Sequence, residues 1–217
     1  MARSKTSRPT PSKAPSAREA ILDTAERLFA ERGANAVSLR EINAEAGYSA
    51  TAQYHHFKTR DALVKGLLAR RRPPILERRA EMLTRLSMNN RPTLKDIVEV
   101  LVRPMAVPLL KDPIVGDLTL RVLARMHFER DKLLAGSVDD GLKLFLPYLK
   151  KVLPHFSERT LTQRWLFAAE LALQSLANLG NLNLAAPHAK QTPEAVETFL
   201  DALIEFIVGG IRGPESR

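Results

Sequence analysis

Apolar residues recur along the chain at the three- and four-residue spacing of amphipathic helices. The first such stretch follows Ser16, which has the capping-box spacing to Glu19, and it ends at Gly33. Its apolar side chains share one helix face and comprise Ile21, Ala25, Leu28 and Phe29. Because similar helical spacing fills most of the remaining chain, the pattern predicts an all-α fold.

Two shorter helices are predicted next. Ser38 has the capping-box spacing to Glu41, and Gly47 ends the helix that follows it. Ser49 can cap a third helix, and a fourth helix begins near Thr59. Three short helices with a glycine-containing turn between the second and the third are typical of a helix-turn-helix unit. In such units the third helix enters the major groove of DNA.

Prolines interrupt the helical spacing in the later part of the chain. Pro73 and Pro74 are expected to kink the fourth helix, because proline cannot donate a backbone hydrogen bond. Pro104 and Pro108 are expected to bend or stop the helix that opens at Thr93. Three further helices are predicted, at 139–156, 157–184 and 193–211.

The last two predicted helices hold more apolar residues than one face of a core requires. One interpretation is that both are buried in the core of a single chain. The other, which we favour, is a four-helix seam between two copies of the chain in a homodimer. The predicted interface residues are Leu173, Leu176, Phe199, Leu203 and Phe206.

The positive charge of the chain is concentrated in its first third. The chain has 33 lysines and arginines against 24 aspartates and glutamates, for a net charge of +9. Residues 1–72 hold 14 of these basic residues and only 7 of the acidic ones. This asymmetry indicates an anionic partner such as nucleic acid or a membrane surface. The alternative is a basic tail that only aids solubility.

Composition narrows the class of protein further. The chain has no cysteine, which excludes disulfides and thiolate chemistry and fits a cytoplasmic protein. No apolar run is long enough to cross a bilayer, so no membrane partner is expected. Residues 1–15 are basic but lack the apolar segment of a signal peptide, and they are predicted to form a disordered basic tail.

The stretch "GYSATAQYHHF" (47–57) raises the question of a metal or catalytic site, since it contains His55 and His56. Neighbouring helical residues point about 100° apart, so these two imidazoles cannot easily share one metal ion. The stretch contains no acid that could orient either ring, and no serine–histidine–acid order is evident. We therefore predict no catalytic residue, no metal site and no cofactor.

Residues 17–68 contain "ILDTAERLFAERG", "VSLREINAEAG" and "YHHFKTRDAL" in that order. This region resembles the N-terminal domain of TetR-family transcriptional regulators (TetR/AcrR-like). Beyond it, the chain resembles the family only in being helical and of suitable length. The resemblance implies a helix-turn-helix DNA-binding domain over 16–62 and a helical ligand-binding and dimerisation domain over 63–212.

The resemblance also implies which residues contact DNA. Those at the start of the third helix would face the bases, and Ser38 and the later cations would bind phosphates. Among the base-facing residues, Thr51 could meet a thymine methyl group or a base edge. The full set is Ser38, Arg40, Ser49, Ala50, Thr51, Ala52, Gln53, Tyr54, His55, Lys58 and Arg60.

Several of these residues also have a purely structural interpretation. Ser38 caps its helix whether or not DNA is bound, and Arg40 could be an ordinary surface arginine. Phe57 is expected to pack against the first helix rather than touch DNA. Two positions depart from the family pattern: Asn43 replaces a usual alanine, and Gln53 replaces a usual aliphatic residue. Either Gln53 reaches outward, or the third helix is rotated slightly.

A ligand pocket among the middle helices is implied by the resemblance, because such pockets are apolar with a few polar groups. The candidate lining residues are Met105, Arg121, Arg125, Met126, Phe128 and Trp165, although core packing is the commoner explanation for any one of them. The predicted function is a homodimeric, DNA-binding transcriptional repressor released from a palindromic operator by a small molecule. Activation instead of repression stays open, and the alternative class is a helical enzyme or carrier with an incidental basic N-terminus.

Overall fold

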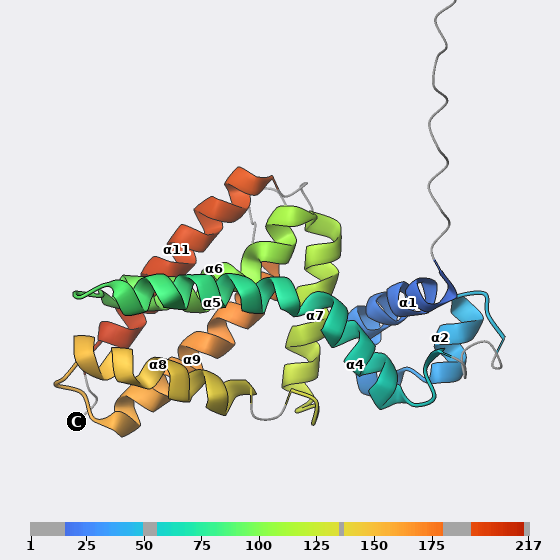
Figure 1. Ribbon diagram of the computed structural model, residues 1–217, viewed down its shortest axis with the longest axis horizontal. Helices are drawn as coiled ribbons and strands as arrows, with labels where there is room; N and C mark the ends of the chain where they lie inside the picture. The colour runs from blue at the N-terminus through green and yellow to red at the C-terminus, as the bar shows by residue number, and fades with distance from the viewer. Residues whose placement is uncertain (1–15, 50–55, 135–136, 180–191, 215–217) are drawn as a thin grey trace, which may run out of the picture.

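The fold is an arrangement of helices, as the sequence predicted. A computed structural model of the chain describes residues 16–49, 56–134, 137–179 and 192–214. The predicted tail at 1–15 and most of the predicted third helix lie outside the described residues. The described elements are α1 (Ala17–Arg32), the 3-10 turn η1 (Ala34–Ala36), α2 (Leu39–Glu45), α4 (Arg60–Arg71), α5 (Pro73–Met88), α6 (Leu94–Lys111), α7 (Pro113–Phe128), α8 (Ser137–Val152), α9 (Glu158–Ala177) and α11 (Pro193–Arg212) (Figure 1).

Serine and threonine caps set where the helices begin. The side chain of each cap accepts a hydrogen bond from the backbone N–H three residues further on. The six caps are Ser16, Ser38, Thr59, Thr93, Ser157 and Thr192. The reciprocal bond of a capping box is present at Thr93, whose backbone N–H donates to Asp96. The caps predicted from sequence at the starts of α1, α2 and α4 are therefore confirmed.

The prolines act differently in the two places where they were expected to matter. At Pro73 and Pro74 one helix passes into the next, and Arg72 stays in the α region between α4 and α5. Its N–H donates to the Leu68 carbonyl at 2.9 Å, so the two helices form one kinked rod (Figure 1). In contrast, α6 continues through its two internal prolines, so the expectation that they could stop it was wrong.

Two apolar clusters organise the molecule. The first joins α1, α2 and α4 and includes Phe57, as expected. It also contains Val122 and Met126 of α7, so the N-terminal unit is completed by a helix from the later part of the chain. Figure 1 shows this unit at one end of the molecule, with α7 beside it. The second cluster is built from α6, α8, α9 and α11, with Leu86 at the end of α5 and with Leu120 and Ala124 of α7.

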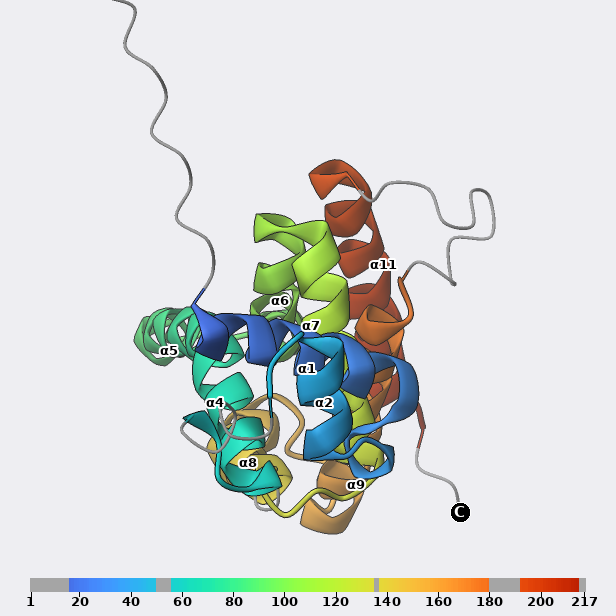
Figure 2. The ribbon, with the colours of Figure 1, turned by 90° about the vertical axis from the view of Figure 1, so that its right-hand side faces the viewer.

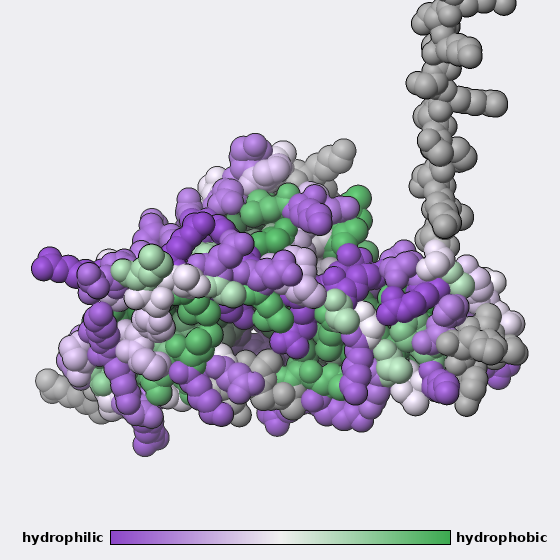
Figure 3. Space-filling view, viewed as in Figure 1, coloured by the Kyte–Doolittle hydropathy of each residue, from purple (hydrophilic) through white to green (hydrophobic). Residues whose placement is uncertain are grey.

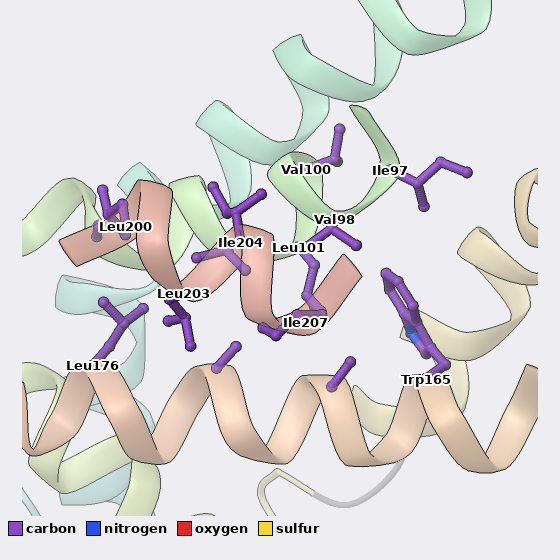
Figure 4. Close-up of a cluster of buried hydrophobic side chains, with 14 of the residues drawn as sticks. Ile97, Val98, Val100, Leu101, Trp165, Leu176, Leu200, Leu203, Ile204 and Ile207 are labelled. Carbon is purple, nitrogen blue, oxygen red and sulfur yellow. The ribbon is translucent and has the colours of Figure 1, made fainter. Parts of the chain in front are cut away.

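The second cluster buries residues that had been assigned to a dimer interface. Leu176 of α9 and Leu203 of α11 are buried inside the single chain, and their side chains lie between the two helices (Figure 4). The physical reason is that each helix turns its most regular apolar face inward, toward α6. Leu176 and Leu203 therefore stabilise the fold of one chain, while Leu173 and Phe199 are partly buried at the edge of the cluster.

Candidate nucleic-acid interface and ligand pocket

Phe57 packs closely against α1 and α4 in the N-terminal unit. A Cβ atom at Gly66 would lie 2.9 Å from Cε1 of Phe57, so glycine lets that ring pack tightly against α4. The guanidinium of Arg18 lies 5.4 Å from the ring centroid on another side. Gly47 has a φ of 75°, which glycine adopts without strain and which ends α2. Phe57 therefore packs α4 closely within the N-terminal unit, which faces the viewer in Figure 2.

Part of the predicted DNA-contacting set is exposed at this end. Ser38, Arg40, Ser49 and Lys58 are all exposed. The hydroxyl of Ser38 accepts a hydrogen bond from the Glu41 N–H at 3.2 Å, so its capping role is filled. His56, which follows the predicted contacts, is exposed as well. The remaining predicted contacts lie outside the described residues and are Ala50, Thr51, Ala52, Gln53, Tyr54 and His55.

Arg60 is engaged inside the chain instead of being free for DNA. Its Nε donates to the Ala34 carbonyl at 3.1 Å, and its terminal nitrogen lies 3.0 Å from a carboxylate oxygen of Asp131. Asp131 is buried beyond the end of α7 and needs this counter-charge. Arg60 therefore forms an ion pair that joins the N-terminal unit to the segment after α7, and its phosphate contact stays a prediction.

A buried carboxylate, Glu26, joins three helices. Its oxygens accept hydrogen bonds from the guanidiniums of Arg71 and Arg70 of α4, the closest at 2.6 and 2.8 Å. The hydroxyl of Thr119 on α7 donates to the same carboxylate at 3.0 Å. Glu26 and Thr119 are both buried. The N-terminal helix α1 is thus tied to α4 and to α7 through one charged group.

This network was not predicted from the sequence, although a signal for it was present. Glu19, Asp23 and Glu26 stand at i, i+4 and i+7, so they form an acidic stripe on α1. Arg70 donates to the first two at 3.1 and 2.7 Å. Burial lowers the pKa of Arg70, but the hydrogen bonds to Asp23 and Glu19 and the charge of Glu26 outweigh it, so the pKa is raised overall.

A cavity of about 430 Å³ lies between the α4–α5 rod and helices α6 to α9. Trp165 and Phe145 line it, with their ring centroids 4.5 Å apart, and Met105 lines it too. On the face shown in Figure 3, apolar surface gathers below α5, over α7 and α8. Two cations, Arg72 and Arg79, also line the cavity. Two of the predicted ligand-binding residues, Met105 and Trp165, therefore come together in one pocket.

The other predicted ligand-binding residues do not line this cavity. Met126 is buried in the N-terminal cluster, because it faces α1 rather than the cavity. Phe128 is 79% exposed at the end of α7. Arg121 and Arg125 lie with it around a separate surface depression, and Arg125 donates to the Arg32 carbonyl at 3.1 Å. These four residues therefore lie outside this cavity, because α7 turns other faces toward the N-terminal cluster and the depression.

An apolar surface remains exposed on α9 and α11, the helices predicted to form a dimer. Phe167 of α9 is 64% exposed and Phe206 of α11 is 70% exposed. Ala202, Phe206 and Gly209 are exposed at i, i+4 and i+7, so they share one face of α11. No other part of the described chain covers these side chains. Large exposed aromatic side chains of this kind are typical of interaction surfaces.

Two negative findings apply to the described residues. They contain no group of three or more histidine, aspartate and glutamate side chains arranged to hold a metal ion. Among the helices described here, none has the length and hydropathy needed to span a bilayer.

Comparisons with known families and proteins agree with this geometry. The family described as "Bacterial regulatory proteins, tetR family" matches residues 21–67, and "Tetracyclin repressor-like, C-terminal domain" matches residues 99–210. The chain is similar to the transcriptional repressor KstR2 of Rhodococcus jostii, with 27% identity over 58% of this chain and 65% of that protein. It is also similar to the repressor BepR of Brucella suis, with 40% identity over 31% of this chain and 32% of that protein. These alignments span less than two thirds of either relative.

Solved structures show the same fold. A crystal structure titled "Probable transcriptional regulatory protein RHA5900" has a TM-score of 0.59 at 17% identity, covering 91% of this chain and all of that one. The fatty acid degradation regulator FadR from Bacillus halodurans has a TM-score of 0.51 at 15% identity, covering 94% of this chain and all of that one.

Proposed function

This chain belongs to the tetR family of bacterial regulatory proteins, and from that premise we propose that it is a homodimeric transcriptional repressor, released from a palindromic operator by a small molecule. It would act in the cytoplasm, where its operator DNA is found. The similar proteins KstR2 and BepR are repressors by name. This favours a regulator over the enzyme or carrier that the sequence left open.

The N-terminal unit supplies the proposed DNA contacts. Ser38 and Arg40 at the start of α2 and Lys58 before α4 are exposed, and Figure 2 shows α2 and α4 at the same end of the molecule. Hydroxyl groups, cations and helix N-termini are the groups that usually bind DNA phosphates. The residues from 50 to 55, which follow α2, would read the bases in the major groove.

The exposed faces of α9 and α11 supply the proposed dimer interface. Pairing these helices with their copies would cover Phe167 and Phe206, which one chain leaves exposed. The exposed glycines Gly209 and Gly210 have no atom close to where a side chain would be, so they allow close helix approach. A two-fold dimer would place two N-terminal units on an inverted repeat, with half-sites about one helical turn apart.

The observation that carries the regulatory proposal is the buried Glu26 network. It ties α1 of the N-terminal unit to Arg70 and Arg71, which directly precede the cavity residue Arg72. A ligand in the cavity would therefore act on the same rod that holds the DNA-binding helices. Such a ligand shifts operator affinity only by the difference in its affinity for the two arrangements.

Genome-wide mapping of bound DNA, followed by titration of the recovered fragment, tests the proposal. The fragment should contain an inverted repeat and bind two chains, as measured by fluorescence anisotropy and by light scattering of the complex. A single asymmetric half-site bound tightly by one chain would contradict the dimeric mode. Compounds that occupy the cavity should then lower the affinity for the fragment.

A further inference from the structure

Arg79 lines an apolar cavity, and no ion pair within the described residues includes it. It projects from α5, its Nε is buried, and that atom has no hydrogen-bond partner among the described residues. Neighbouring arginines behave differently, since Arg70 and Arg71 both bind carboxylates of the chain. Burial lowers the pKa of Arg79, and the positive charge of Arg72 lowers it further. A buried charge left in this way is costly unless something else pairs with it.

A second arginine faces the same space. Arg72, Ile75, Leu76 and Arg79 stand at i, i+3, i+4 and i+7, so one face of the rod presents two apolar groups between two cations. Arg72, like Arg79, lies in no ion pair of the described chain. The wall that α5 contributes to the cavity therefore carries two positive charges, which lie on the same helix face about two turns apart.

The carboxylate of Glu170 lines the cavity, and both of its oxygens already have partners within the chain. Glu170 of α9 lies 2.8 Å from Nε2 of His127 through one oxygen. Its other oxygen accepts a hydrogen bond from the side chain of Gln174 at 3.1 Å. Glu170 therefore does not neutralise the two arginines, and among the described residues that line the cavity no other carboxylate is present.

The rest of the lining is hydrocarbon. Phe145 and Trp165 form one wall, and Leu101, Met105 and Leu120 continue it. The volume of about 430 Å³ falls within the range of roughly 300–1,000 Å³ that small-molecule pockets have. Such a space suits an apolar body much larger than an inorganic anion, so phosphate or sulfate alone would leave most of it unfilled.

We propose that this cavity binds an amphipathic carboxylic acid, with its hydrocarbon body against Trp165 and Phe145 and its carboxylate paired with Arg79 and Arg72. The planar guanidinium group matches a carboxylate with two parallel hydrogen bonds, which makes arginine well suited to this role. The assignment deepens the proposed function and rests on it for any effect on DNA.

The position of Arg72 gives the acid a route to the DNA-binding unit. Arg72 directly follows Arg70 and Arg71, which hold Glu26 of α1. A carboxylate that draws Arg72 toward the cavity reorients the turn of helix at the α4–α5 kink. The arginines on that turn would then hold α1 at a different angle to α7.

Calorimetric titration of the full-length, DNA-free protein tests the site. The probes are two matched pairs, decanoate with 1-decanol and 2-naphthoate with 2-naphthalenemethanol. At least one acid should bind roughly 10-fold or more tightly than its alcohol, a difference of about 1.4 kcal/mol. Equal binding of acid and alcohol in both pairs, or no binding of either acid, would overturn the proposal.

Variants at neighbouring positions assign the effect to Arg79. Arg79→Met should reduce the preference for the acid to that which Arg72 alone supports and leave alcohol binding within about 2-fold, while Arg79→Lys should keep more of the preference. Arg78→Met is the matched control, because Arg78 points away and pairs with Glu81 at 3.1 Å. An unchanged preference in Arg79→Met would refute the assignment.

Stability and DNA binding give two further readouts. Arg79→Met without ligand should unfold at the same or a higher urea concentration than the wild type, because it removes an unpaired cation. A large loss of stability would instead give Arg79 a structural role and overturn the proposal. Acid binding that leaves operator affinity unchanged would support the carboxylate site and contradict ligand-released repression.

Discussion

The carboxylate of Glu26 accepts a hydrogen bond from the hydroxyl of Thr119 at 3.0 Å, although 93 residues separate them in the chain. Glu26 belongs to α1 of the N-terminal unit, and Thr119 belongs to α7, which borders the cavity through Leu120 and Leu123. Arg70 and Arg71 hold the same carboxylate from α4. One buried group therefore links the two halves of the protein.

Replacing Glu26 and Thr119 one at a time should lower the free energy of unfolding by different amounts. Glu26→Gln leaves Arg71 facing a neutral amide, while Arg70 keeps Glu19 and Asp23. We therefore expect a cost of about 3 kcal/mol, at the lower end for the loss of a buried charge partner. Thr119→Val removes one hydrogen bond and should cost about 1–2 kcal/mol. Urea unfolding followed by circular dichroism measures both. A smaller loss for Glu26→Gln than for Thr119→Val would contradict the central place of the carboxylate.

Arg60 and Lys58 should respond oppositely to truncation. Arg60→Ala leaves buried Asp131 without its cation and should cost about 3 kcal/mol of folding free energy, at the lower end for such pairs since Arg60 is partly exposed. Lys58→Ala should leave stability nearly unchanged and weaken binding to all DNA sequences alike. It should also flatten the salt dependence by roughly one unit per lost phosphate contact.

Unfolding curves and anisotropy titrations at several salt concentrations distinguish the two roles. A flattened salt dependence in Arg60→Ala with full stability would restore the phosphate contact first predicted for it. The double variant Arg60→Ala with Asp131→Asn is the control, because removing both charges should recover part of the lost stability.

Thr51 should determine a base preference. Thr51→Ala should change which base is favoured at one position of each half-site by roughly 1–3 kcal/mol if the predicted contact is made. Competition binding against operators with single base changes measures the preference. If Gln53→Ala altered it while Thr51→Ala did not, the register of the recognition helix would be displaced from the one predicted.

The sequence was sufficient for features that depend on nearby residues. The caps at Ser16 and Ser38, the end of α1 at Gly33 and the inward position of Phe57 follow from spacings of a few residues. Short-range patterns of this kind determine helix boundaries and apolar faces before tertiary contacts are known. The kink at the two prolines belongs to the same class.

Features that join distant segments could not be predicted in the same way. Arg60 looked like a free cation because its partner, Asp131, lies 71 residues further along the chain. Met126 looked like a pocket residue because a helical pattern gives its apolar faces but not which neighbour each face meets. In α7 one face packs on α1 and another borders the cavity, so the assignment required the fold.

The apolar residues of α9 and α11 fall into an exposed set, available for a dimer, and a buried set, which stabilises one chain. Phe206→Glu should give a monomer with nearly unchanged folding stability, because Phe206 is 70% exposed in one chain. Leu203→Ala should keep the dimer and lose about 2–5 kcal/mol of stability, because Leu203 is buried in the core of one chain. Light scattering and urea unfolding together measure both effects. A monomeric wild type of 24.2 kDa at micromolar concentration would contradict the interface.

The kink between α4 and α5 should determine how strongly ligand and operator affect each other. Replacing Pro73 and Pro74 with alanine restores two backbone donors and favours a straighter, more continuous helix. The junction would then favour the straighter geometry over the kinked one. We expect the double variant to bind operator with altered affinity and to show a smaller change in that affinity when an acid occupies the cavity.

Paired titrations measure this coupling, with operator added in the presence and absence of acid and the reverse. The two directions must give the same factor, since coupling between binding sites is reciprocal. A wild-type factor of 100, for example, corresponds to about 2.7 kcal/mol. Pro193→Ala is the matched control, because Pro193 also begins a helix but lies on α11, away from the junction. The coupling factor could instead be as large in the Pro73→Ala, Pro74→Ala double variant as in the Pro193→Ala control. In that case the α4–α5 junction would not transmit the signal. The hydrogen bond between Glu26 and Thr119 of α7 would then be the remaining route.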